Sequence, residues 1–141
     1  MSTLEHAIAL SVETHKGQVD KYGRPYILHP LRVMFRLGRE DEQIVAVLHD
    51  VVEDSELTFD DVRQMGYSEE IIAALDGVTR RDDETYEEFV RRSGQNPISR
   101  RVKLADLEDN MDIRRLSNEL TNKDFTRLQR YRKAWAQLQS D

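Results

Sequence analysis

The chain has 141 residues, close to the size of one domain, and contains no cysteine, which excludes a disulfide scaffold, a cysteine nucleophile and a thiolate metal site. Its net charge of −6 argues against sequence-independent binding to duplex nucleic acid, although a local basic pocket could still bind small anions. No apolar run approaches the roughly 20 residues of a membrane helix and the N-terminus does not resemble a signal peptide, so we expect a cytoplasmic protein without a membrane partner.

Apolar residues recur at helical spacing along almost the whole chain, and no stretch shows the sustained period of two that is typical of strands. Several segments begin with capping signals. Thr58 is followed by Asp61 in a capping-box pattern, Ser68 precedes the next apolar segment, and Asn96-Pro97 opens a longer one. The sequence therefore predicts an all-α fold. The expected helices cover residues 3–16, 30–38, 41–54, 59–65, 69–78, 85–92, 97–116 and 122–139.

The last expected helix carries a long apolar stripe at helical spacing. Such a stripe either closes the core of the domain or forms a dimer face, and we favour core packing. The sequence does not determine the oligomeric state. The stripe consists of Phe125, Leu128, Tyr131, Trp135 and Leu138.

The expected helix over residues 41–54 is apolar almost all round and should be buried, yet it carries four ionisable side chains. His49 and Glu53 are four residues apart, as are Asp50 and Asp54, so each pair shares a helix face. Burying unpaired carboxylates costs several kcal/mol each, and a divalent cation would offset that cost. The alternatives are a solvated helix end at Glu53 and Asp54, and a hydrogen-bonded core pair of His49 and Asp50.

Two other segments carry matching side chains. His29-Pro30 lies where a loop meets a helix, and Asp106 and Asn110 form a polar pair four residues apart on a core-facing helix. Taken alone, these residues would be a capping or surface histidine and an exposed helical acid.

A metal-ligand set emerges when these residues are combined, namely His29, His49, Asp50 and Asp106. Two imidazoles and two carboxylates without sulfur suit Mn²⁺, Fe²⁺ or Zn²⁺ rather than Ca²⁺. Four protein ligands leave open positions for water and substrate on a six-coordinate metal. His6 and His15 lie outside this set, and we interpret both as structural or surface residues.

These motifs resemble those of the HD-domain metal phosphohydrolases. More narrowly, they resemble the hydrolase domain of RelA/SpoT-type proteins and the stand-alone small alarmone hydrolases. The resemblance implies a single HD-type helical bundle over residues 1–141, with no second domain and therefore no synthetase activity. The matching segments are GQVDKYGRPYILHP (17–30), AVLHDVVED (46–54), LDGVTRR (75–81) and VKLADLEDNMD (102–112).

The resemblance also implies an activity, namely removal of the 3′-pyrophosphate from ppGpp and pppGpp with Mn²⁺ or another divalent metal as cofactor. Carried over to this chain, the metal ligands would be the four residues named above. Glu53 and Asp54 match the acidic pair that handles the attacking water. Asn110 matches a residue that contacts the substrate near the ribose, and Lys21 matches a basic loop residue that helps to hold the nucleotide.

Two positions depart from the family's pattern by replacing an arginine with an acid. Asp20 stands where an arginine usually stacks on the base, and Asp112 stands two residues after Asn110, where an arginine is usual. Asp20 could accept a hydrogen bond from an exocyclic amine, so ppApp is an alternative substrate. The missing positive charge could come from Arg24, Arg80, Arg81, Arg100, Arg101 or Lys103.

Two other functions remain open at the level of sequence. One is a different HD phosphohydrolase, such as a 5′-nucleotidase acting on deoxynucleoside monophosphates. The other is a non-catalytic nucleotide-binding module, against which the complete set of metal and acid residues argues.

Overall fold

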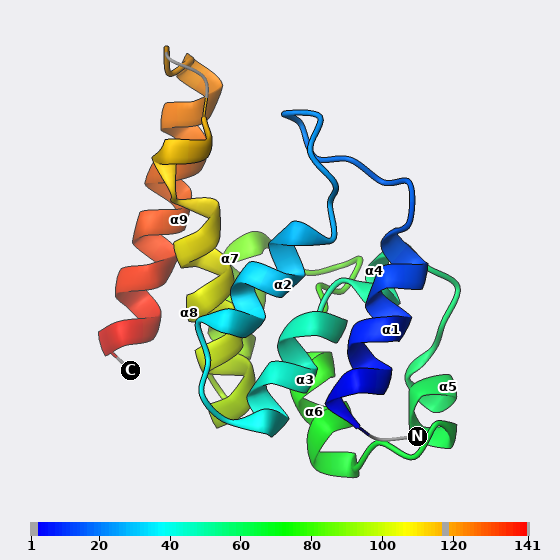
Figure 1. Ribbon diagram of the computed structural model, residues 1–141. Helices are drawn as coiled ribbons and strands as arrows, with labels where there is room; N and C mark the ends of the chain where they lie inside the picture. The colour runs from blue at the N-terminus through cyan, green and yellow to red at the C-terminus, as the bar shows by residue number, and fades with distance from the viewer. Residues whose placement is uncertain (1–2, 117–118, 141) are drawn as a thin grey trace.

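The computed structural model describes residues 3–116 and 119–140 (Figure 1). Its regular elements in that part of the chain are helices, apart from an isolated bridge between Val19 and Pro25, which confirms the all-α prediction. No helix within these ranges is long and apolar enough to cross a membrane. The helices are α1 (Leu4–His15), α2 (Leu28–Phe35), α3 (Glu40–Leu48), α4 (Val51–Asp54), α5 (Phe59–Gln64), α6 (Glu69–Gly77), α7 (Tyr86–Ser93), α8 (Pro97–Asn110), the 3₁₀ helix η1 (Ile113–Arg115) and α9 (Asn122–Ser140).

The predicted capping residues begin their helices. The Thr58 hydroxyl accepts a hydrogen bond from the backbone N–H of Asp61, whose carboxylate accepts one from the N–H of Thr58. Ser68 caps α6 in a similar way, and Asn96 accepts from two backbone N–H groups at the start of α8. Each cap satisfies donors that would otherwise have no partner, which explains why these helix starts could be predicted.

The core is organised around α3, which packs against α1, α2, α6 and α8. Residues 44–48 of α3 are all buried, so this helix is apolar on every side, as its sequence predicts. A smaller apolar cluster lies where α8 meets α7 and α9, and α9 runs alongside α8 (Figure 1). The members of the smaller cluster include Val90, Leu107, Ala134 and Leu138.

The prediction of one continuous helix over residues 41–54 is wrong. The chain breaks between α3 and α4 at His49 and Asp50. The Nδ1 atom of His49 lies 2.5 Å from the carbonyl oxygen of Ala46, an acceptor that would otherwise bond to the backbone of a continuing helix. A side chain that takes such a carbonyl interrupts the ladder of backbone hydrogen bonds and bends the helix.

Two other expected helices differ in part from the structure. α8 ends at Asn110 instead of Leu116, because Asp112 accepts from the N–H of Arg114 and starts η1. In α9, Leu138 is buried and Trp135 packs against the smaller cluster, which confirms core packing for this end of the stripe. Phe125, at the other end, is 56% exposed and does not contribute to the core.

The tightest approach of a glycine to a neighbouring element lies at Gly77, where α6 meets α8. A Cβ atom at this position would lie 2.6 Å from the Ser99 hydroxyl. Ser99 is fully buried and its hydroxyl donates to the carbonyl of Ser93, so it has no room to move aside. We expect Gly77→Ala to lower the free energy of unfolding by about 1–3 kcal/mol through overpacking.

Urea denaturation followed by circular dichroism measures this difference. Gly38→Ala is the matched control, because a Cβ atom at Gly38 meets nothing within 4 Å among the residues described. Equal denaturation midpoints for the two variants would contradict the close packing of α6 on α8.

Candidate functional site

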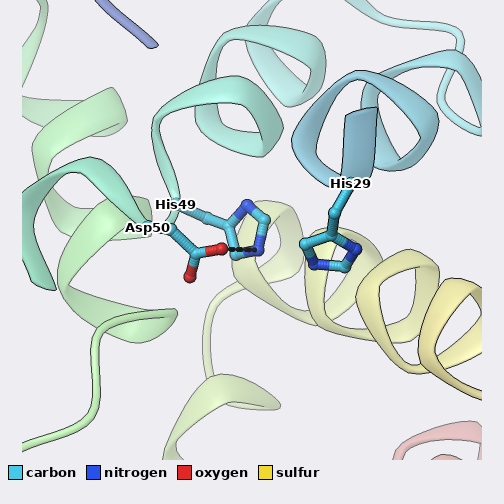
Figure 2. A group of neighbouring side chains, drawn as sticks. All are labelled: His29, His49 and Asp50. Atoms are coloured by element: carbon cyan, nitrogen blue, oxygen red, sulfur yellow. Dashed lines mark ion pairs between the residues drawn. The ribbon is translucent and has the colours of Figure 1, made fainter. Parts of the chain in front are cut away.

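Three separate parts of the fold bring the predicted metal ligands together. His29 lies in the first turn of α2, His49 and Asp50 lie at the break between α3 and α4, and Asp106 lies on α8. Figure 2 shows the two imidazoles and the Asp50 carboxylate directed toward a common centre. The helix break is responsible for part of this arrangement, because it places His49 near Asp106 of α8 and Asp50 near His29 of α2.

The distances within the group suit a metal ion. One ligand atom from each of His29, His49 and Asp50 lies within 4.8 Å of the others. Asp106 completes the set, since its Oδ1 atom lies 2.9 Å from Nε2 of His29 and 3.5 Å from Nε2 of His49. The four residues that the sequence singled out are therefore neighbours in the structure.

The Nε2 atom of His49 is the observation that best fits a bound cation. It is buried and has no aligned hydrogen-bond partner among the described residues, although carboxylate oxygens of Asp50 and Asp106 lie 3.2 and 3.5 Å away. Its ring partner Nδ1 already faces the Ala46 carbonyl. Burial opposes a charged imidazole, but the two carboxylates outweigh it and raise the pKa of His49 to about 10. The site thus favours positive charge at its centre, which a divalent metal supplies.

Each ligand carboxylate also has a partner besides the histidines. The Tyr26 hydroxyl donates to Asp50, and burial together with Asp50 raises the pKa of this tyrosine. The Lys103 ammonium lies 3.0 Å from Asp106 and 4.8 Å from the centre of the Phe89 ring. Lys103 was predicted to contact substrate, but the structure places its charge against Asp106, deep in the fold. A role in substrate binding stays a prediction.

The expected acidic pair lies on α4, one turn beyond Asp50. One Glu53 oxygen accepts from the backbone N–H of Arg80 at 2.7 Å. Desolvation raises the pKa of Glu53, the Arg80 N–H opposes this, and Asp50 adds to it. Asp54 accepts from the Gln18 amide at 3.5 Å and lies 3.8 Å from Nδ1 of His15.

His15 therefore lies beside the site rather than apart from it. It is 1% exposed and packs beside the Tyr26 ring, with 5.0 Å between ring centres. The interpretation of His15 as structural is consistent with this burial, and a surface position is not.

A cavity of about 450 Å³ opens over the metal ligands. Its walls come from the loop over residues 18–26, from α8 and η1, and from the first half of α9. Three expected substrate contacts, Asp20, Lys21 and Asn110, lie on these walls. The full lining is Gln18, Val19, Asp20, Lys21, Tyr22, Tyr26, His29, Arg32, Asp50, Asp106, Asn110, Arg115, Leu116, Asp124, Arg127, Leu128 and Tyr131.

The positive charge on the cavity wall comes mostly from residues that the sequence did not single out. Besides Lys21, these are Arg32, Arg115 and Arg127. Several of the expected cations interact elsewhere in the described chain. Arg81 pairs with Asp76, Arg101 pairs with Glu42, and Arg100 donates to the Gly94 carbonyl.

Asp20 and Asp112, the two acids that replace arginines of the family's pattern, both have polar partners in the structure. Oδ1 of Asp20 accepts from the backbone N–H groups of Tyr22 and Arg24 at 2.8 and 3.0 Å, which holds the loop in its turn. Asp112 lies 2.7 Å from the guanidinium of Arg114. One oxygen of Asp20 is therefore occupied by its own loop, and Asp112 is absent from the described lining of the cavity.

Asp109 is the buried residue that the sequence interpretation missed. It is fully buried on α8, three residues after Asp106, and its Oδ2 atom lies 2.6 Å from Nδ1 of His29. Arg32 donates to both of its oxygens, at 2.8 and 3.1 Å. The signal available in the sequence was the three-residue spacing from Asp106, which places both acids on one helix face.

Comparisons with known proteins agree with this geometry. No protein-family model matches the chain. A guanosine-3′,5′-bis(diphosphate) 3′-pyrophosphohydrolase of Aquifex aeolicus is 30% identical over 120 residues, covering 77% of this chain and 17% of that protein. A GTP pyrophosphokinase of Streptomyces coelicolor is 34% identical over 121 residues, covering 77% of this chain and 14% of that protein. The chain thus spans less than a fifth of the length of these relatives.

The fold has a solved counterpart. A metazoan orthologue of SpoT, described as hydrolysing ppGpp, superposes with a TM-score of 0.74 at 22% identity. The match covers 96% of this chain and 84% of that one. The homologues of the hydrolase class imply a divalent metal, for which the His/Asp group described above is the matching site. In its sequence relatives, its fold and the placement of its HD motif, the chain is similar to the HD-type hydrolase domains of the RelA/SpoT proteins.

Proposed function

We propose that the chain is a metal-dependent 3′-pyrophosphohydrolase of alarmone nucleotides, (p)ppGpp or (p)ppApp, which releases pyrophosphate and a nucleoside 5′-di- or triphosphate. The observation that carries this proposal is the convergence of two histidines and two aspartates on the floor of a cavity whose walls include Lys21, Arg115 and Arg127. The name of the Aquifex relative points to the same reaction.

The ion would be held by His29, His49, Asp50 and Asp106, and we propose Mn²⁺ from the mixture of imidazole and carboxylate ligands. When bound, a divalent cation in this position supplies charge stabilisation at the 3′-phosphate and a lowered pKa for water. A cytoplasmic location and a small-molecule nucleotide as the ligand stay predictions.

The acidic pair of α4 would handle the attacking water. The backbone N–H of Arg80 fixes one oxygen of Glu53, so the orientation of this carboxylate is set by the main chain. Its raised pKa suits a group that takes a proton near neutral pH. We assign Glu53 as the base and Asp54, which the Gln18 amide orients, as the second acid at the water.

The cavity walls would bind the nucleotide. Lys21, Arg115 and Arg127 come from three segments and supply the charge that several phosphates need. Asn110 donates to Asp106 at 3.4 Å, so it lies beside the metal ligands, where the 3′ side of the ribose would be. With Oδ1 of Asp20 occupied by the loop, a hydrogen bond to an exocyclic amine would fall to its other oxygen.

Metal binding can be tested without substrate. Adding Mn²⁺ at about a hundred times its dissociation constant should stabilise the fold by about 2.7 kcal/mol and raise the melting temperature by several degrees. Asp106→Ala should lose this shift, because it removes a ligand that contacts both histidines. Glu70→Ala, which alters an exposed acid on α6, is the control and should keep it. Differential scanning calorimetry measures both, and a shift that survives Asp106→Ala would contradict the ligand set.

The reaction is tested by incubating Mn²⁺-loaded protein with ppGpp and ppApp and separating the products by anion exchange. We expect pyrophosphate and a nucleoside diphosphate from one or both substrates. Glu53→Gln should keep the metal-dependent stabilisation but lower turnover by roughly 10²–10⁴-fold, the usual contribution of a general base. Near-normal turnover of Glu53→Gln would remove this residue from the mechanism.

The same assay separates the alternative functions. Absence of turnover of both alarmones by metal-loaded protein would contradict the proposal. Release of phosphate from deoxynucleoside monophosphates would then favour a 5′-nucleotidase. Nucleotide binding without turnover would favour a non-catalytic module.

Phosphate binding by the wall of α9 is tested at Arg127. A charge-assisted hydrogen bond contributes about 1.5–3 kcal/mol, so Arg127→Gln should raise KM by roughly tenfold or more, with a smaller effect on kcat. Arg132→Gln is the matched control on the same helix, because Arg132 lies over the Trp135 ring and is not among the described residues of the cavity. Equal KM values for the two variants would show that α9 does not bind the phosphates.

A further inference from the structure

The two ring nitrogens of His29 face two different carboxylates, both from α8. Nε2 lies 2.9 Å from Asp106, on the side of the metal centre, and Nδ1 lies 2.6 Å from Asp109, on the opposite side. A neutral imidazole has one protonated nitrogen and one with a free lone pair, and only the latter can bind a metal. Whichever carboxylate accepts the N–H of His29 therefore decides which nitrogen is the ligand.

At the neighbouring ligand, His49, a backbone carbonyl determines which ring nitrogen carries the proton. Its Nδ1 lies 2.5 Å from the Ala46 carbonyl, an acceptor that cannot donate, so Nδ1 carries the proton. Its Nε2, which has no hydrogen-bond partner among the described residues, then faces the centre and is the nitrogen left to bind a metal. The two histidines are arranged alike, except that the oxygen behind His49 belongs to the neutral backbone and the oxygen behind His29 belongs to a carboxylate.

Asp109 is held as an anion by the residues around it. Its side chain has no exposure to solvent, and Arg32 from α2 donates to both of its oxygens. Arg115 from η1 donates to the Asp109 carbonyl at 2.6 Å and approaches its carboxylate at 3.4 Å.

We propose that Asp109 is a positioning residue of the metal site, which accepts the Nδ1–H of His29 and thereby directs Nε2 of His29 at the metal. This inference rests on the proposed function, because it concerns the same metal centre. A carboxylate behind a histidine ligand fixes its ring and raises its basicity, and the loss of such a partner typically costs 10- to 100-fold in metal affinity.

A purely structural role is the competing explanation, since Asp109 also joins α2, α8 and η1 through its two arginines. The chain offers a matched control for this role. Glu42 on α3 is likewise a buried carboxylate, 3% exposed, and it pairs with Arg101 of α8. No contact between Glu42 and a metal ligand occurs in the described structure. Glu42→Gln should therefore perturb the fold in a similar way without reaching the metal.

The experiment titrates Mn²⁺ and Co²⁺ into metal-free protein, with no nucleotide present, by calorimetry and by the visible spectrum of bound Co²⁺. The proteins compared are the unmodified chain, Asp109→Asn and Glu42→Gln. We expect Asp109→Asn to weaken metal binding by roughly 10- to 100-fold and to change the Co²⁺ spectrum, while Glu42→Gln leaves both unchanged. Equal affinities and spectra for all three proteins would overturn the inference but leave the proposed function intact.

A second measurement needs no variant and covers the case in which Asp109→Asn does not fold. Long-range ¹H–¹⁵N correlation spectra of the Zn²⁺-loaded chain identify the protonated nitrogen of each histidine. We expect the proton of His29 on Nδ1, and a proton on Nε2 would overturn the inference. Failure of the unmodified chain to bind any of the three metals would instead contradict the proposed function itself.

Discussion

The contact between the imidazole of His49 and the carbonyl of Ala46 is the one on which the rest of the site depends. It ends α3 after Leu48 by taking a carbonyl that a continuing helix would use. The same contact leaves Nε2 of His49 as the nitrogen that faces the centre. The turn that follows directs Asp50 toward His29 of α2 and starts α4, which carries Glu53 and Asp54. A single local hydrogen bond thus helps to position two of the metal ligands, His49 and Asp50, together with the acidic pair.

Each aspartate around the candidate metal site is stabilised by a hydrogen bond or an ion pair. The three aspartates nearest the histidines each have a different partner besides an imidazole. Tyr26 donates to Asp50, Lys103 pairs with Asp106, and Arg32 pairs with Asp109. Each aspartate also faces an imidazole. Buried carboxylates are tolerated only when they are paired and hydrogen-bonded, so these further partners are a condition for the site.

The cavity above the centre combines segments that are distant in sequence. The loop over residues 18–26 forms one wall, and η1 with the first half of α9 forms another. Of the two acids that depart from the family's pattern, Asp20 stabilises its own loop, and Asp112, which is not among the described lining residues, pairs with Arg114. Arg115 and Arg127 bring guanidinium groups to the cavity, where Arg127 pairs with Asp124. The charge of the wall therefore cannot be judged from the loop alone.

The sequence by itself determined the all-α class, most helix starts and the four residues that meet as candidate ligands. Helix spacing and caps are local properties, and buried ionisable residues stand out on an apolar helix wherever it packs. Only the tertiary structure decided the break at His49, the end of α8 at Asn110, and the exposure of Phe125. It also decided that Asp109 lies behind His29, 80 residues away in the chain, and that Arg127 faces the cavity. The two helix ends follow from local side-chain contacts of His49 and Asp112 that helical spacing does not record, and the other features depend on which surfaces of distant segments meet.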